Sequence, residues 1–188
     1  MKKLVIVCAV LAAFSIAAGA QDYPKVEVFG GYVFNHYNLD KVGFNLNGGT
    51  GSISYNPTQT LGLVADISVY HGNPKFGIAE LDTTRVSYLF GPKLAMRSNP
   101  KFTPYVHSLF GSVHESVTVK FPGVPSFPAE TDNAFGMALG GGVDVKVHNN
   151  IAIRVAQVEY VFTKFRDAVD NHQSGVRIST GIVFRFGS

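Results

Sequence analysis

The chain has 188 residues, of which 46% are hydrophobic and 15% charged, and its formal net charge at pH 7 is +3. Its 16 basic and 13 acidic residues are too evenly balanced for a nucleic-acid-binding protein, and a single cysteine excludes a scaffold held by internal disulfides. The length suits one domain.

Residues 1–20 have the parts of a secretory signal peptide. Two lysines precede an apolar stretch, and the small residues Ala18 and Ala20 form an expected cleavage site. The apolar stretch is shorter than the roughly 20 residues that a membrane-spanning helix needs. We therefore expect cleavage before Gln21 and export of a mature protein without cysteine, because Cys8 lies in the leader.

Residues 21–188 alternate between apolar and polar side chains, and clusters of Gly, Pro and Asn interrupt the alternation. A period of two predicts β-strands, whereas the helical period of 3.6 is nearly absent. The eight expected strands, in chain order, lie at residues 25–36, 43–56, 60–71, 83–97, 102–115, 132–147, 150–164 and 174–186.

Four of these strands divide into an apolar face and a face that carries charge. In the fourth strand, Tyr88 and Phe90 oppose Arg85 and Lys93, and the same division recurs in the third, sixth and eighth strands. Alternation alone does not separate a membrane barrel from a soluble sandwich, because the apolar face of a sandwich is its core.

Some strands are irregular. The second strand changes parity at residues 48–51, which we interpret as a bulge, and the seventh changes parity around Val155 and Ala156, which predicts another. Pro92 and Pro104 fall inside expected strands, where the missing N–H is unfavourable.

The segments between the strands alternate in length. Short turns lie at 57–59, 99–100 and 148–149, and mostly longer loops lie at 38–40, 72–81, 116–131 and 166–173. Short periplasmic turns and long external loops are typical of outer-membrane barrels. With the leader, and with strands long enough for the 9–11 residues that cross a bilayer, this pattern predicts an all-β fold: an eight-stranded antiparallel up-and-down transmembrane β-barrel over residues 21–188. We expect it in the bacterial outer membrane, in contact with outer-membrane lipid and lipopolysaccharide.

The interior of such a barrel is expected to hold the charged side chains. A Lys or Arg facing lipid at mid-membrane costs roughly 2–4 kcal/mol, and eight strands enclose a space that side chains fill. We therefore expect a plugged, ion-paired lumen, with His107 and Glu115 as further candidates. The residues expected to form its ion pairs are Glu27, Asp66, Arg85, Lys93, Asp144, Arg154, Glu159, Arg177 and Arg185.

Five segments, taken as a set, resemble strands of the outer-membrane β-barrel families related to the OmpA transmembrane domain. They are residues 88–97, 103–111, 134–147, 151–165 and 179–186. The resemblance implies insertion by the barrel-assembly machinery and a closing strand with an aromatic end, here Phe186 followed by Gly187 and Ser188. Longer relatives carry a peptidoglycan-binding domain, and we expect a stand-alone barrel without it.

His172 and Ser174 have the spacing of the catalytic pair in outer-membrane lipid A deacylases, which are also eight-stranded barrels. That family has a downstream Glu and an Asn after the Ser, whereas no acidic residue follows Ser174 and Gly175 takes the place of the Asn. Because a catalytic base needs an orienting partner, we expect no catalytic residue, no cofactor and no enzyme activity. Lipid A modification is kept as an alternative.

Four histidines fall near the external ends of different strand pairs. His36, His71, His114 and His172 would make a metal site if they converged at the rim, since imidazole binds zinc and copper. A rim of polar loops also contains histidine without binding metal, and we expect no metal.

The longest expected loop contains an apolar, proline-rich run. Extended proline-rich segments serve as recognition surfaces, so we hypothesise that this loop contacts an external partner of unknown identity. The alternative is a run that packs over the barrel mouth. The candidate residues are Phe121, Pro122, Val124, Pro125, Phe127 and Pro128.

These features predict a small integral outer-membrane barrel with a structural, envelope-integrity or surface-interaction role. A narrow channel for small solutes or ions is the first alternative. A soluble lipocalin-like carrier is disfavoured, because the GxW signature of that family requires Trp and the chain has none.

Overall fold

The computed structural model describes residues 23–39, 42–72, 75–76, 79–120, 127–165 and 172–187. None of these residues belongs to a helix long and apolar enough to cross a membrane. The strands are β1 (Val26–Leu39), β2 (Val42–Tyr55), β3 (Leu61–Gly72), β4 (Lys75–Phe76), β5 (Ala79–Ala95), β6 (Phe102–Lys120), β7 (Phe127–His148), β8 (Ile151–Phe165) and β9 (His172–Phe186).

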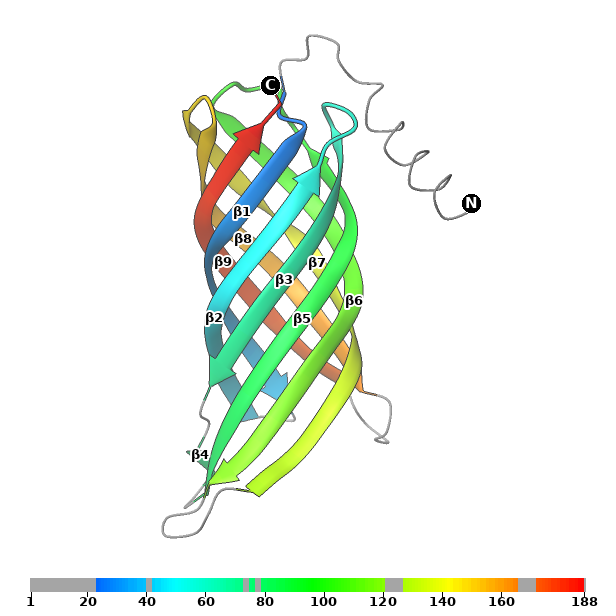
Figure 1. Ribbon diagram of the computed structural model, residues 1–188, viewed down its shortest axis with the longest axis vertical. Coiled ribbons are helices and arrows are strands. Elements are labelled where there is room, and N and C mark those ends of the chain that lie inside the picture. Colours follow the sequence, from blue (N-terminus) through cyan, green and yellow to red (C-terminus); the bar gives the residue numbers. More distant parts are fainter. Residues whose placement is uncertain are drawn as a thin grey trace, which may run out of the picture.

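Eight long strands close into one antiparallel barrel, and β4 is a two-residue strand that pairs with β5. The ring is completed where β1 pairs with β9 and where β3 pairs with β5. Figure 1 shows the strands winding obliquely around a common axis. The expected eight-stranded antiparallel barrel is therefore confirmed.

The two ends of the barrel differ. Val26 pairs with both Tyr55 and Phe186, so β1 begins where β2 and β9 end. The turns that join β2 to β3, β5 to β6 and β7 to β8 lie at this end, which we call the short-turn end. At the opposite end β5, β6 and β7 project beyond β1, β2, β8 and β9 (Figure 1). In outer-membrane barrels the short turns face the periplasm.

Two of the expected loops are shorter than the sequence predicts. The loop expected at 116–131 is largely strand, because β6 continues to Lys120 and β7 begins at Phe127. Likewise β5 begins at Ala79, inside the loop expected at 72–81. Val and Thr residues flank both loops and favour extended structure, so the antiparallel pairing continues past the segment that a bilayer requires.

The bulge predicted in β2 at residues 48–51 is wrong. β1 and β2 pair without a register shift over their whole lengths. The change of parity has a different cause: Leu46 is buried inside the barrel, where it packs with Val33 and Tyr70. An apolar side chain that faces inward in this part of β2 therefore gives the same sequence pattern as a bulge.

The bulge predicted in β8 is confirmed. The pairing of β8 with β9 shifts register between Arg154 and Gln157. Val155 and Ala156 are both exposed, whereas Arg154 and Gln157 are both buried. The extra residue lets two polar side chains of opposite parity point into the same lumen.

Pro92 and Pro104 lie inside β5 and β6, on the exposed face of each strand. The pairing of β5 with β6 is interrupted at Gly91 and Pro92 and resumes in the same register at Lys93. The strands thus accept the loss of a ladder hydrogen bond without a change of alignment.

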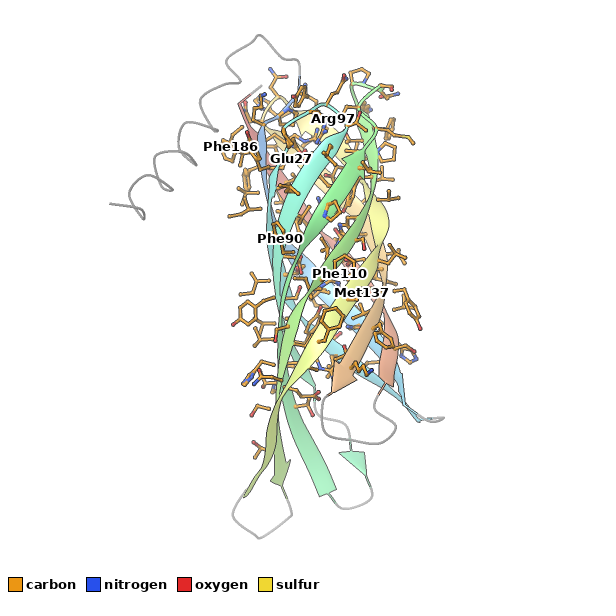
Figure 2. The ribbon with its side chains drawn as sticks, turned by 90° about the vertical axis from the view of Figure 1, so that its right-hand side faces the viewer. Glu27, Phe90, Arg97, Phe110, Met137 and Phe186 are labelled. Carbon is orange, nitrogen blue, oxygen red and sulfur yellow. The ribbon has the colours of Figure 1, made fainter. Side chains whose placement is uncertain are left out.

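The apolar faces point outward, as the alternation predicts. On β5, Tyr88 is 54% and Phe90 58% exposed, whereas Arg85 is 0% and Lys93 2% exposed. Figure 2 shows Phe90 and Phe110 on the outer side of the ribbon. The barrel therefore has an apolar exterior and a charged interior, whereas a water-soluble sandwich has a polar exterior and an apolar interior.

Gly48 and Gly49 in β2 provide a matched test of strand packing. A Cβ on Gly48 would lie 1.8 Å from the backbone oxygen of Val69, whereas a Cβ on Gly49 would have nothing within 4 Å. We expect Gly48→Ala to weaken the pairing of β2 with β3 and to lower the temperature at which the barrel unfolds. Gly49→Ala should leave that temperature unchanged. Heat-dependent migration on a denaturing gel measures both, and equal unfolding temperatures would argue against the close approach.

Candidate functional site

All nine charged residues predicted to form ion pairs point into the barrel. Each is at most 6% exposed, and each forms at least one ion pair. They are Glu27, Asp66, Arg85, Lys93, Asp144, Arg154, Glu159, Arg177 and Arg185. The pairs form three clusters along the lumen, which we call the mouth, middle and outer clusters, starting from the short-turn end.

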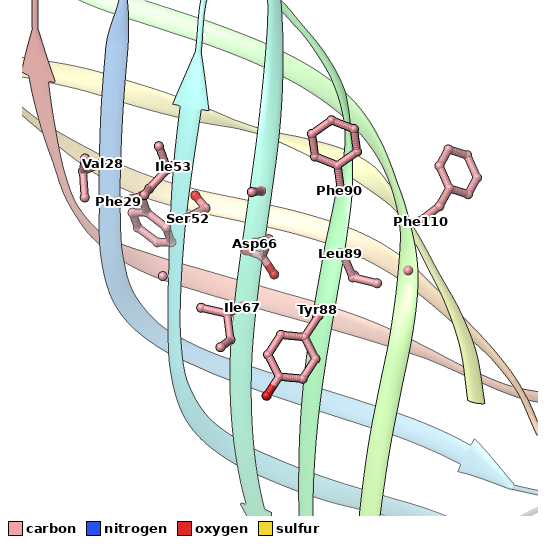
Figure 3. A pocket seen from close by; sticks show the side chains of 13 residues that line it. Val28, Phe29, Ser52, Ile53, Asp66, Ile67, Tyr88, Leu89, Phe90 and Phe110 are labelled. Atoms are coloured by element: carbon pink, nitrogen blue, oxygen red, sulfur yellow. The ribbon is translucent and has the colours of Figure 1, made fainter. Parts of the chain in front are cut away.

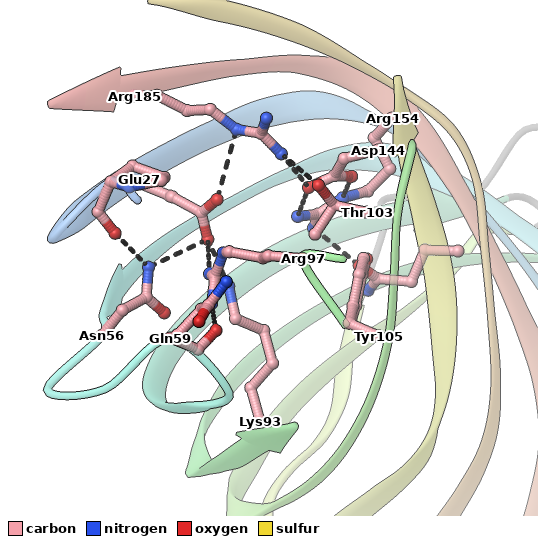
Figure 4. Close-up of polar contacts among 12 residues, drawn as sticks. Glu27, Asn56, Gln59, Lys93, Arg97, Thr103, Tyr105, Asp144, Arg154 and Arg185 are labelled. Atoms are coloured by element: carbon pink, nitrogen blue, oxygen red, sulfur yellow. Dashed lines mark hydrogen bonds and ion pairs between the residues drawn. The ribbon is translucent and has the colours of Figure 1, made fainter. Parts of the chain in front are cut away.

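Glu27 is the centre of the mouth cluster (Figure 4). Its carboxylate lies 2.5 Å from Lys93 Nζ, 3.4 Å from Arg97 Nη2 and 3.3 Å from Arg185 Nε. The amide of Asn56 also donates to Glu27 Oε2 at 3.3 Å. One carboxylate from β1 therefore joins side chains from β5, β9 and two of the short turns.

Asp144 is the second carboxylate of the mouth cluster. Arg154 donates to its two oxygens, from Nε at 2.8 Å and from Nη2 at 3.2 Å, in a forked arrangement that fixes both groups. Arg185 Nη2 lies 3.8 Å from Asp144 and links the two carboxylates of the cluster. Arg154 also donates to Gln157, whose side-chain oxygen accepts a second hydrogen bond from Tyr105 at 2.5 Å.

Arg177 is the centre of the middle cluster and ties opposite walls of the barrel together. It donates to Glu159 from Nη2 at 2.5 Å and from Nε at 2.6 Å, and its Nη1 lies 3.1 Å from Asp66. Tyr70 accepts a further bond from Nη1 at 3.2 Å. His107 Nε2 lies 2.8 Å from Glu159. Residues of β3, β6, β8 and β9 thus meet across the lumen.

The outer cluster is a single pair within the described residues. Arg85 Nη2 lies 2.6 Å from Glu115 Oε2, across the pairing of β5 with β6. The arginine side chain is fully buried, and the glutamate side chain is 14% exposed. Of the further candidates from the sequence, Glu115 therefore forms an ion pair with Arg85, and His107 forms a hydrogen bond with Glu159.

Sequence reasoning did not select Arg97, Tyr105 or Gln157. Arg97 has the same parity as Lys93 and falls within the strand expected at 83–97, so parity was a signal that could have found it. In the structure β5 ends at Ala95, and Arg97 lies in the turn that follows. Burial lowers the pKa of Arg97 from its usual value, and the neighbouring Glu27 carboxylate opposes this change. An arginine remains charged at neutral pH, so Arg97 adds a full positive charge to the mouth.

The side chains of the mouth and middle clusters fill the lumen where they meet. The space between Lys93, His107, Arg154 and Gln157 does not admit a water-sized sphere. These side chains therefore leave no room for water in this part of the lumen.

Three of the four rim histidines point away from the lumen. His36 and His71 are exposed and His114 is partly exposed, and each forms a hydrogen bond to a polar side chain of a paired strand. The side chain of His172 is not described. In the described part of the chain, no three His, Cys, Asp or Glu side chains form a group suited to a metal ion.

The proline-rich candidates fall mostly outside the described residues. Phe127 and Pro128 belong to the backbone of β7, opposite Val119 and Thr118 of β6. The remaining candidates, outside the described residues, are Phe121, Pro122, Val124 and Pro125. Contact of this segment with a partner stays a prediction.

The outer face has an apolar groove of about 640 Å³ (Figure 3). Small residues, Gly51 and Ala65, form part of its floor, and larger side chains that include Ile67, Tyr88 and Phe90 stand around it. The groove crosses β1, β2, β3, β5 and β6 on the face that is expected to contact acyl chains.

Comparisons with known proteins agree with this architecture. Residues 6–184 match the family described as the outer membrane protein beta-barrel domain. No curated protein matches the sequence.

Solved structures of three outer-membrane proteins superpose over most of the chain. Ail, the attachment invasion locus protein of Yersinia pestis, is 19% identical with a TM-score of 0.59, over 86% of this chain and 99% of Ail. Neisserial surface protein A is 17% identical with a TM-score of 0.62, over 89% of this chain and 99% of that protein. OprG from Pseudomonas aeruginosa is 10% identical with a TM-score of 0.50, over 88% of this chain and 97% of OprG.

At these identities the three structures support the fold alone, whereas the family match covers nearly the whole chain. The resemblance to OmpA-type barrels is thereby confirmed, and the chain belongs to the outer membrane protein β-barrel domain family.

Proposed function

We propose that this protein is an integral outer-membrane barrel with a closed lumen, whose role is structural or lies in contacts made at the membrane surface. Family membership implies the bacterial outer membrane. The observation that carries the proposal is the tie that Arg177 makes between Glu159 and Asp66, because it joins β3, β8 and β9 across the lumen. A barrel filled in this way would serve as a rigid support for its external segments.

The biogenesis and surroundings expected from the sequence belong to the same proposal. The leader at 1–20 would be removed on export, and the barrel-assembly machinery would insert the chain. Outer-membrane lipid and lipopolysaccharide would then contact the apolar exterior. The names of two structural neighbours, an attachment invasion locus protein and a surface protein, support a surface role for this chain.

Conductance across a planar bilayer tests the closed lumen. The refolded protein should give no stable unitary current, because the side chains where the mouth and middle clusters meet leave no room for water between them. Glu159→Ala combined with Arg177→Ala removes the tie across the lumen and should produce intermittent currents. Lys164→Ala, on the exposed face of β8, is the matched control and should behave as the wild type.

The alternative function, a narrow passage for small solutes or ions, is supported by the polar character of the lumen from the mouth cluster to the outer cluster. A large and stable unitary conductance of the wild-type protein would favour that alternative and reject the closed barrel. Heat-dependent gel migration of the same sample shows that the barrel is folded, so a silent bilayer is not mistaken for a misfolded protein.

A further inference from the structure

A small pocket opens in the mouth of the barrel at the short-turn end. Its volume is about 130 Å³, and it lies between the turn after β5, the ends of β7 and β9 and the segment before β1. The side chains around it come from Pro24, Arg97, Asn99, Pro100, Thr103, Lys146, Asn149 and Arg185.

The charge of this pocket is positive. Arg97, Lys146 and Arg185 line it, and none of its lining residues is acidic. The carboxylates nearest to the two arginines are those of the mouth cluster. Glu27 lies within 3.4 Å of both arginines and Asp144 within 3.8 Å of Arg185. Lys146 takes part in no ion pair with another described residue.

The mouth cluster does not neutralise itself. In the described part of the chain, two carboxylates, Glu27 and Asp144, pair with four cations: the buried Lys93, Arg154 and Arg185 and the half-buried Arg97. The cluster therefore holds two more positive than negative charges. Like charges held close together repel one another, so an anion at the mouth would lower the electrostatic energy of the folded barrel.

Hydrogen-bond donors are also available at the pocket. Arg97, one of the lining residues, has a buried Nε that lacks a hydrogen-bond partner among the described residues. The side-chain oxygen of Asn99 accepts from the backbone N–H groups of Lys101 and Phe102, which leaves the amide NH₂ as the group of Asn99 that can donate to a ligand. Thr103 and Asn149 add a hydroxyl and a second amide to the lining.

Guanidinium, ammonium and amide donors without an acidic neighbour in the lining are the groups that recognise phosphate and similar oxyanions. The volume is below the roughly 300–1,000 Å³ of pockets that enclose an organic ligand. We propose that the pocket binds a phosphate-type oxyanion, either as free phosphate or as the phosphate of a lipid headgroup. This proposal does not depend on the proposed surface role.

Titration of the refolded chain in maltoside micelles with inorganic phosphate, at constant ionic strength, tests the site by calorimetry. The wild type should show saturable binding. Lys146→Gln should weaken it about tenfold, as expected for the loss of one charge-assisted hydrogen bond. Lys101→Gln removes the same charge from an exposed side chain at the same end, outside the pocket lining, and should change affinity by less than about twofold.

A second variant and a second lipid condition complete the experiment. Asn149→Ala alters the lining outside the strands and should also weaken phosphate binding. Short-chain phosphatidylglycerol added to the micelles distinguishes the two sources of phosphate. If the pocket binds lipid headgroups, the lipid competes and lowers the apparent affinity for inorganic phosphate. If the pocket binds only free phosphate, the lipid leaves that affinity unchanged. Absence of saturable binding to the folded wild type, or equal weakening by Lys101→Gln and Lys146→Gln, would overturn the proposal.

Discussion

Replacing Arg177 with methionine is expected to lower the free energy of unfolding by about 3–5 kcal/mol, the range measured when one partner of a buried ion pair is removed. The Arg177 side chain is 2% exposed and bonds two carboxylates, Glu159 and Asp66. Without it, Asp66 retains hydroxyl donors and Glu159 retains His107 and Gln157. Neither carboxylate keeps an arginine, so the charge of both remains inside the barrel with less compensation.

Urea unfolding in lipid vesicles, followed by far-ultraviolet circular dichroism, measures this change; the chain has no Trp for a fluorescence assay. Arg177→Lys should recover part of the loss, because it restores the charge but not the fork that reaches both Glu159 oxygens. Lys164→Met on the exposed face of β8 is the control and should be nearly neutral. A loss for Arg177→Met no larger than that for Lys164→Met would show that the middle cluster does not stabilise the barrel.

Ile67→Arg is expected to destabilise the folded barrel in a bilayer by about 2–4 kcal/mol, the cost of a cation on the lipid face at mid-membrane. Ile67 is 45% exposed near the centre of β3, with its side chain on the outer face. In a water-soluble protein an exposed isoleucine tolerates arginine, because the charge stays hydrated. The size of the loss therefore reports whether this face contacts acyl chains.

Leu61→Arg provides the matched comparison on the same face of the same strand. Leu61 is 39% exposed and begins β3 beside a short turn, so its replacement should cost about 0–1 kcal/mol near the membrane interface. Ile67→Ala controls for the loss of the apolar side chain alone. Equal effects of Ile67→Arg and Leu61→Arg in vesicles would be incompatible with a bilayer around β3.

The sequence is informative about the faces of the strands because the side-chain period of a strand is two. Arg85, Lys93 and Arg177 have the parity opposite to their apolar neighbours, and all three are buried in the structure. The same rule located the bulge in β8, where Arg154 and Gln157 both face inward despite their opposite parity. Periodicity failed in β2, because Leu46 lies in an apolar part of the interior that the rule assigns to the outside.

The residue types also predict that the lumen contains ion pairs, but they do not predict which residues pair with one another. An eight-stranded barrel that places arginines inside must pair them there, so an ion-paired lumen follows from the residues alone. The choice of partners does not follow. Asp66 and Arg177 are separated by 111 positions in the chain, and their contact depends on the tilt of the strands and on the pairing of β3 with β5 and of β1 with β9.

Local patterns of the sequence therefore determined the class of fold, the direction in which each strand turns its charges and the expectation of a filled lumen. Only the closed barrel decided that Glu27 forms ion pairs with Lys93, Arg97 and Arg185. The closed barrel also decided that an excess of positive charge lies beside a pocket at the short-turn end. The physical reason is that parity is a property of one strand, whereas a contact across the lumen depends on the register and tilt of all of them.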